Sequence, residues 1–272
     1  MKIFGSVFIV TGASSGIGAA TVRELAGRGG TVVMAARRSN LLDPIAEELT
    51  QKARQVLAVP TDVRNRQSID ELVAKTVAAY GRVDGVINAA GIVGAGVVGQ
   101  ATDEILEQLV LTNLLAPARL IHAALPFMRH DGSAAIVNIG SVAGEMGTNG
   151  MYSATKFGLR GLNDSLRREL RTKRIAVSLI EPGWIRTAMT THINYRIPGP
   201  ELIADAVARV LERPKRSLIL PWQWRPLVRG VQLFPGIADA VFGSQRGQAK
   251  VHRRRVDAAA SAQDLVDSSE HS

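Results

Sequence analysis

Short apolar runs rich in β-branched residues alternate with amphipathic stretches along most of this chain. Such runs are typical of buried parallel strands, whereas helices that cover a sheet repeat apolar residues at three- and four-residue steps. The pattern predicts strands at residues 6–11, 31–36, 55–59, 83–87, 134–139, 175–180 and 217–220. It predicts a helix that ends near residue 28, and further helices at about 43–52, 67–80, 102–128, 152–173 and 201–212.

Strands and helices that alternate in this way imply right-handed crossovers within one sheet. We therefore predict an α/β fold: a single-domain, Rossmann-type, doubly wound parallel sheet of about seven strands, with helices on both faces. The chain has 272 residues, 46% of them hydrophobic, which suits one sizeable domain better than two small ones. The predicted domain covers residues 1–246, and residues 247–272 are predicted to be a disordered tail.

A glycine-rich turn follows the first predicted strand and leads directly into a helix. In this context glycines permit a tight turn and a close approach to a phosphate, and the helix N-terminus attracts a pyrophosphate. We expect a dinucleotide to bind here, the alternative being a turn that is merely structural. The residues of this turn expected to contact the cofactor are Gly12, Ser14, Ser15, Gly16, Ile17 and Gly18.

The second predicted strand ends at Ala36 and is followed by Arg37 and Arg38. In a dinucleotide fold this position lies beside the adenine ribose, where an acidic residue binds the 2′-hydroxyl of NAD. Here the sequence has no carboxylate to repel a 2′-phosphate, and two guanidinium groups are available to bind one. The sequence favours NADP(H) over NAD(H); the alternative is that both arginines are solvated loop residues.

Small or polar residues follow the carboxyl ends of the other predicted strands, where ligands bind in open α/β sheets. Asp62 is expected to accept a hydrogen bond from the adenine amino group, the alternative being a turn residue. Thr187 is expected to donate to a carboxamide. The cofactor-contacting residues expected at these ends are Asp62, Val63, Asn88, Ala89, Ala90, Gly91, Pro182, Gly183, Ile185 and Thr187.

Tyr152 and Lys156 are four residues apart in a predicted helix, which places them one turn apart on the same face. An ammonium group near a phenol favours the phenolate and lowers the phenol pKa. Ser141 follows a predicted strand and offers a hydroxyl to hold a substrate oxygen opposite the phenol. These three side chains predict a proton-transfer site for an alcohol or a carbonyl, although the Tyr–Lys spacing alone is common by chance.

Pro117 lies four residues after Asn113 in the predicted helix 102–128. Proline has no N–H to donate to the carbonyl at i−4 and usually kinks the helix. The carbonyl of Asn113 is therefore freed and must find another partner, for which water is the expected one. An ordinary proline kink is the alternative.

The composition excludes several kinds of chemistry. The chain has no cysteine, which excludes disulfides, thiol catalysis and cysteine-ligated metals, and its five histidines show no metal-ligand spacing. No metal is expected. The amino terminus runs directly into a strand and leaves no room for a signal peptide, so a cytoplasmic location is expected. No run of about 18 uncharged apolar residues occurs, so no membrane-spanning helix is expected.

The net charge of +9 is concentrated near the carboxyl end. Residues 209–255 hold eleven Lys or Arg against two acidic residues, or +9, whereas the remainder has 22 of each and is neutral. A neutral fold with one basic segment argues against a nucleic-acid partner. Residues 222–242 combine arginines with apolar residues at three- to four-residue steps. This pattern fits a lid over a lipophilic substrate, a surface packed on the fold or on a second subunit, or peripheral contact with an anionic membrane.

Together these motifs resemble those of the classical short-chain dehydrogenase/reductase family over about residues 6–221. They are Thr11-Gly12-x3-Gly16-x-Gly18, Asp62, Asn88-Ala89-Ala90-Gly91, Asn113, Ser141, Tyr152-x3-Lys156 and Pro182-Gly183-x3-Thr187. The resemblance implies that Tyr152 is the general acid and base and that Ser141 hydrogen-bonds the substrate oxygen. It also implies that Lys156 binds the nicotinamide ribose and that the main-chain carbonyl of Asn113 holds a water in a proton relay.

We therefore expect an NADP(H)-dependent oxidoreductase that interconverts a secondary alcohol and a ketone, with a lipophilic small molecule such as a steroid, a retinoid or an acyl chain as its substrate. The alternative is a sensor or scaffold that binds NADP(H) without turnover. Tyr152 follows Ser141 by eleven residues, whereas thirteen is usual in the family, so residues 146–151 form a shortened loop that alters the pocket. Small residues in the 152–173 helix permit close packing with the sheet or with another subunit, and a homodimer or homotetramer is expected.

Overall fold

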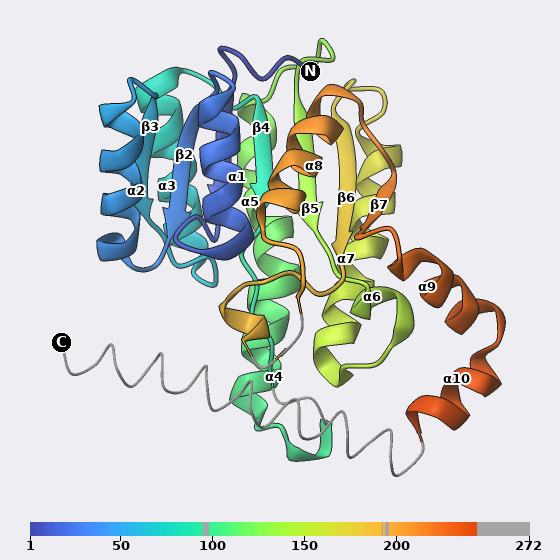
Figure 1. Cartoon of the computed structure of the whole chain (residues 1–272). Helices are drawn as coiled ribbons and strands as arrows, with labels where there is room; N and C mark the ends of the chain where they lie inside the picture. The colour runs from blue at the N-terminus through green and yellow to red at the C-terminus, as the bar shows by residue number, and fades with distance from the viewer. Residues whose placement is uncertain (95–97, 192, 194–195, 244–272) are drawn as a thin grey trace.

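Seven parallel strands form one sheet in the order β3-β2-β1-β4-β5-β6-β7 (Figure 1). The computed structural model describes residues 1–94, 98–191, 193 and 196–243, so the predicted tail at 247–272 lies outside the described residues. The strands are β1 Val7–Thr11, β2 Thr31–Ala36, β3 Val56–Pro60, β4 Gly85–Asn88, β5 Ala135–Ile139, β6 Ala176–Pro182 and β7 Ser217–Leu220. The strand order reverses between β1 and β4, and in such sheets ligands bind at the carboxyl ends beside this point.

Helices cover both faces of the sheet, as predicted (Figure 1). On one face lie α1 Gly16–Gly27, α2 Ser39–Gln51 and α8 Glu201–Glu212, whose apolar residues share a core with alternate side chains of the strands. On the other face α3 Arg66–Tyr80, α5 Ala116–Ala124 and α7 Gly150–Glu169 share a second core. Strands buried on both faces explain why the sequence shows continuous apolar runs rather than alternation.

The shorter elements lie mostly at the carboxyl edge of the sheet. The remaining helices are α4 Asp103–Val110, α6 Ala143–Met146, α9 Trp224–Leu233 and α10 Pro235–Phe242. Single turns occur at η1 Val98–Gln100, η2 Leu111–Leu115, η3 Leu125–Phe127 and η4 Ala188–Thr190. Because α6 ends at Met146 and α7 begins at Gly150, only three residues separate the two helices, and Met151 belongs to α7 rather than to the predicted loop.

The prediction that the second helix begins at Asp43 is wrong, because α2 begins at Ser39 after an extended Arg38. Pro44 therefore lies inside the helix, where it cannot donate to the carbonyl at i−4. Leu42, Ile45 and Leu49 recur at helical spacing and are buried against the sheet. Burial of Leu42, which requires the extra turn, offsets the loss of one hydrogen bond.

The prediction of one long helix over 102–128 is also wrong in detail. The chain forms α4, then the π-helical turn η2, then α5, and the N–H of Ala116 donates to the carbonyl of Leu111 at i−5. A wider turn is one way to accommodate Pro117. By length and composition the run Asp103–Phe127 could cross a membrane, contrary to expectation, but in this fold it packs against α3 and α7.

Candidate active site

Three glycines shape the turn between β1 and α1. Gly12 has φ +67° and lies so close to the segment after β4 that a Cβ would stand 2.9 Å from Ala90 Cα. Gly16 has φ +52°, and a Cβ on Gly18 would stand 2.0 Å from the carbonyl oxygen of Gly12. Side chains are therefore excluded at these positions, and the backbone is left bare at the amino end of α1. This geometry suits a phosphate group.

The residues around this turn leave the helix N-terminus accessible. Ser15 is the exposed N-cap residue of α1, and its side chain makes no capping hydrogen bond within the described part of the chain. Ser14 and Ile17 are partly exposed, and Ile17 packs against the core on its inner side. The first N–H groups of α1 point toward the carboxyl edge of the sheet, and the Ser15 side chain does not accept a hydrogen bond from them. They can therefore donate to an anion.

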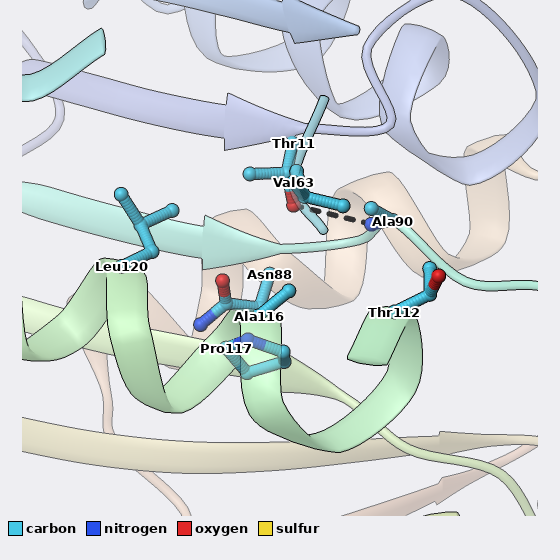
Figure 2. Close-up of a pocket in the computed structure, with 8 residues that line it drawn as sticks. All are labelled: Thr11, Val63, Asn88, Ala90, Thr112, Ala116, Pro117 and Leu120. Atoms are coloured by element: carbon cyan, nitrogen blue, oxygen red, sulfur yellow. Dashed lines mark hydrogen bonds between the residues drawn. The ribbon is translucent and has the colours of Figure 1, made fainter. Parts of the chain in front are cut away.

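Thr11 fastens the end of β1 to the segment that leaves β4. Its Oγ1 accepts from the N–H of Ala89 at 3.1 Å and from the N–H of Ala90 at 3.2 Å, and Figure 2 shows the second of these. Thr11 and Ala90 also line a cavity of about 10 Å³ that reaches α5 (Figure 2). A cavity of this volume holds at most about one water molecule, so a cofactor must lie outside it, on the glycine side of the turn.

A chain of buried side-chain amides crosses the sheet below the site. Asn88 Nδ2 donates to Asn138 Oδ1 at 2.9 Å, and Asn138 Nδ2 donates to Asn163 Oδ1 at 3.1 Å. The chain links β4, β5 and α7. Because a buried amide without a partner costs about 1–3 kcal/mol, these bonds fix the relative positions of the three elements. The structure thus places Asn88 in the core beneath the site.

Asn113 connects the π-turn to two neighbouring segments. Its Oδ1 accepts from the N–H of Ile92 at 2.9 Å, and its Nδ2 donates to the carbonyl of Ile92 at 2.9 Å and to Thr155 Oγ1 at 3.3 Å. Pro117 has no N–H with which to satisfy the Asn113 carbonyl. A Cβ on Gly91 would stand 3.4 Å from Asn113 Oδ1 and 3.7 Å from Lys156 Nζ, so the backbone at Gly91 lies close to both side chains.

Tyr152, Lys156 and Ser141 meet at the carboxyl end of β5. The first turns of α7 carry Tyr152 and Lys156, and Lys156 Nζ lies 5.8 Å from the centroid of the Tyr152 ring. Lys156 is buried, and its Nζ donates to the carbonyl of Ile139 at 2.9 Å. Ser141 follows Ile139 by two residues, and its hydroxyl hydrogen-bonds the Tyr152 phenol. The structure thus brings together the three side chains that the sequence predicted.

Burial dominates the ionisation of this group. It raises the pKa of Tyr152, and the hydrogen bond with Ser141 opposes this rise. It also lowers the pKa of Lys156 from 10.5 to about 8. At neutral pH the phenol is therefore protonated and the lysine is mostly an ammonium ion. The expected lowering of the Tyr152 pKa by Lys156 is not seen in this structure, because loss of hydration has the larger effect.

The end of β2 and the end of β3 present opposite charges. Arg37 and Arg38 are exposed beyond Ala36. Asp62 forms a two-pronged ion pair with Arg64, with Arg64 Nη2 at 2.6 Å from Asp62 Oδ2. Arg64 and, more weakly, Arg37 lower the Asp62 pKa. Both oxygens of the Asp62 carboxylate, which was predicted to bind adenine, thus accept hydrogen bonds from Arg64. The sequence did not predict this ion pair, although the two residues are only two positions apart.

The segment from Pro182 to Thr187 forms the opposite wall. Gly183 lies under the indole of Trp224, and a Cβ on Gly183 would stand 2.1 Å from Trp224 Nε1. The rings of Trp184 and Trp224 pack edge to face with centroids 5.0 Å apart. Thr187 lies beside Gly16, and its backbone N–H donates to Thr190 Oγ1 at 2.9 Å. Ile185 is buried and Pro182 ends β6, so this wall belongs to the rigid fold.

A hydrogen bond to a partly buried ion pair joins α9 to the helices of the site. The carboxylate of Glu145, on α6, pairs with Arg160 on α7 and accepts a hydrogen bond from Gln232 on α9. Glu181 is buried near Arg160, accepts from Ser217 Oγ, and has a pKa raised by burial. Sequence analysis identified neither Glu145 nor Trp224. The apolar helical pattern in residues 222–242 includes Trp224, but such a pattern does not predict which residues a helix contacts.

Comparisons with known proteins show the family to which this chain is related. The family model "short chain dehydrogenase" matches residues 6–197. The uncharacterized oxidoreductase YxnA of Bacillus subtilis (strain 168) is 32% identical over 88% of this chain and 71% of its own length. An uncharacterized oxidoreductase of Staphylococcus haemolyticus (strain JCSC1435) is 35% identical over 78% of this chain and 94% of its own.

Solved structures resemble about four fifths of this chain. A dehydrogenase/reductase from Sinorhizobium meliloti 1021 is 28% identical, with a TM-score of 0.74 over 80% of this chain and 95% of that one. A blue fluorescent protein from a metagenomic library, solved in complex with NADPH, is 29% identical, with a TM-score of 0.74 over 81% of this chain and 98% of that one. The chain is therefore a member of the short chain dehydrogenase family.

Proposed function

We propose that this oxidoreductase transfers a hydride between NADP(H) and a carbon of a secondary alcohol or ketone. The observation that carries the proposal is the meeting of Tyr152, Ser141 and Lys156 beside the bare amino end of α1. A nicotinamide cofactor, when bound, supplies or accepts the hydride. The glycine turn fits such a group, because side chains at Gly12 and Gly18 would fill the space against Ala90 and the turn itself.

Tyr152 moves the proton in this mechanism. Burial keeps its phenol protonated at neutral pH, so it is ready to donate to the oxygen of a ketone as the carbon is reduced. Ser141, already bonded to the phenol, holds the same oxygen. In the reverse direction the ammonium of Lys156 stabilises the phenolate that takes the proton from an alcohol. The carbonyl of Asn113, left without a proline N–H, offers a place for a relay water.

The test is Tyr152→Phe, with Tyr80→Phe as the matched control at the end of α3, away from the site. After a screen of ketones and alcohols with NADPH and NADP⁺ has identified a substrate, we expect Tyr152→Phe to reduce kcat by about 10²–10⁴-fold. NADPH affinity should be retained, and Tyr80→Phe should be fully active. Undiminished turnover by Tyr152→Phe would refute the mechanism.

The preference for NADP(H) rests on the two exposed arginines beyond β2. Charge-assisted hydrogen bonds from Arg37 and Arg38 would bind a 2′-phosphate. Among the similar solved structures, a short chain dehydrogenase from Burkholderia cenocepacia J2315 (25% identical, TM-score 0.73) is in complex with NADP. Arg37→Ala/Arg38→Ala should weaken NADPH binding by at least about tenfold and leave NADH binding unchanged, whereas Arg54→Ala should change neither. Equal losses for both cofactors would contradict this assignment.

The substrate proposed is apolar, because Trp184 and Trp224 form an aromatic wall next to Gly183. The second candidate function is a sensor that binds NADP(H) without turnover. The feature that favours it is the short connection between Ser141 and Tyr152, in which only three residues separate α6 from α7. NADPH binding without consumption of any screened ketone would support the sensor and count against the dehydrogenase.

We further propose that the enzyme is cytoplasmic and that it forms a homodimer or homotetramer. Light scattering after gel filtration tests the oligomeric state.

A further inference from the structure

The last two described helices expose an unusual amount of apolar surface. Half of the large hydrophobic side chains exposed in the described residues belong to the segment Trp222–Val241. Phe234 is 59% exposed, Ile237 65% and Leu233 72%. None of the eight residues of α10, all of them described, is buried. Large apolar side chains that are exposed this close together along the chain mark an interaction site.

The two helices differ in how they contact the fold. The side of α9 that carries Trp224 and Val228 packs against the fold, and Val228 is 2% exposed. In contrast, α10 packs mainly against α9 and projects from the body of the molecule (Figure 1). Because α10 packs mainly against α9 rather than against α7, which carries Tyr152, its exposed apolar side chains are not a roof over the active site.

Arginines accompany the apolar side chains. Arg225, Arg229 and Leu233 follow one another at four-residue steps, so they form a row on the outer face of α9, and all three are exposed. The following stretch 246–255 adds five Lys or Arg and no acidic residue to the sequence. Apolar side chains flanked by cations are the composition of helices that lie in the interface of an anionic bilayer.

We propose that the docking face, defined as Arg225, Arg229, Leu233, Phe234, Ile237 and Val241, binds the surface of an anionic lipid membrane. The apolar members enter the headgroup region and the arginines pair with lipid phosphates. A second copy of the chain fits less well. A twofold interface sets the same patch against itself, and the docking face has no acidic member that could pair with the arginines of a partner copy.

The experiment uses the full chain and two kinds of vesicle, without substrate. We expect co-sedimentation with vesicles of phosphatidylcholine mixed with phosphatidylglycerol, and weak binding to pure phosphatidylcholine. High salt should release the protein, since it screens the arginines. Phe234→Glu/Ile237→Glu should reduce binding by at least about tenfold, and Arg225→Gln/Arg229→Gln by about tenfold or more. The matched control, Val98→Glu/Phe127→Glu, exchanges exposed apolar residues elsewhere and should bind as the unmodified protein does.

Three outcomes would overturn the proposal. They are equal binding to both kinds of vesicle, no loss of binding in Phe234→Glu/Ile237→Glu, and a dimer in solution that these glutamates dissociate. The substituted side chains are exposed, so the variants should fold, which circular dichroism verifies. Because vesicle binding is measured without substrate or cofactor, its failure leaves the proposed dehydrogenase activity intact, and a failed activity screen leaves the membrane proposal intact.

Discussion

Gly183→Ala should destabilise the protein because of one side chain, the indole of Trp224. A Cβ on Gly183 would stand 2.1 Å from Trp224 Nε1 and 2.4 Å from its Cδ1, which is far inside van der Waals contact. Gly183 follows the extended end of β6, and its φ is not in the left-handed region that favours glycine. Alanine therefore costs nothing in backbone strain, and the collision with Trp224 is the source of the expected effect.

The expected loss of stability follows from the contacts that the Trp224 indole loses when it moves. To make room for a methyl group, Trp224 must rotate away from Trp184, with which it now packs at 5.0 Å and 81°. Such aromatic pairs contribute about 0.5–1.5 kcal/mol beyond their buried area, and overpacking typically costs about 1–3 kcal/mol. We expect a loss of about 1–3 kcal/mol in the free energy of unfolding. For a chain of this size that corresponds to about 2–4 °C in Tm per kcal/mol.

The assay is urea denaturation of Gly183→Ala, Trp224→Ala and the double variant, all without cofactor. Once Trp224 is absent, Gly183→Ala should be neutral or stabilising by about 0.4–1 kcal/mol, because alanine reduces the entropy of the unfolded chain. The matched control is Gly27→Ala, at the end of α1, where no atom lies within 4 Å of the added Cβ. The reasoning is refuted if Gly183→Ala costs the same in both backgrounds, since the two residues would then be energetically independent.

Two further predictions concern buried charges. Burial lowers the Lys156 pKa from 10.5 to about 8, so between these pH values the unfolded chain binds more protons than the folded one. The free energy of unfolding should therefore rise with pH across this range, by up to about 3 kcal/mol relative to Lys156→Met. Urea denaturation from pH 7 to pH 11 measures the difference, and parallel plots of unfolding free energy against pH for the two proteins would exclude it. Glu145→Gln should lower the free energy of unfolding by about 1–3 kcal/mol, because it deprives partly exposed Arg160 of its buried partner. The control Glu48→Gln, in a surface pair with Arg23, should lower it by less than about 1 kcal/mol. Equal losses in Tm for the two variants would contradict the expected effect of burial.

The sheet could be predicted from the sequence because its signals are local. Each apolar run is short, continuous and bounded by polar residues, and the structure has a strand at all seven predicted positions. The glycine turn was predictable for the same reason, since Gly12 and Gly16 adopt positive φ within a strand–turn–helix unit. The meeting of Tyr152 with Lys156 needed only helical spacing.

The predicted and observed helices differ where a local sequence signal competes with tertiary packing. Asp43-Pro44 is a good start for a helix, but burial of Leu42 draws α2 back to Ser39. Pro117 removes one hydrogen bond, and either a kink or a wider turn can absorb the loss. Asn113 in the wider turn bonds Ile92 and Thr155. Neither contact can be read from the spacing of residues along one helix.

The segment after β7 shows how tertiary contacts separate alternatives that a sequence leaves together. One apolar pattern over 222–242 is compatible with a lid, a packed surface or a membrane contact. In the structure α9 joins the site through Trp224 at Gly183 and through Gln232 at Glu145, whereas α10 has no buried residue. The side of α9 that carries Trp224 therefore belongs to the wall of the site, whereas α10 belongs to the surface. Substitutions in α9 at Trp224 should consequently change catalysis, while those at Ile237 in α10 should change only what the protein binds.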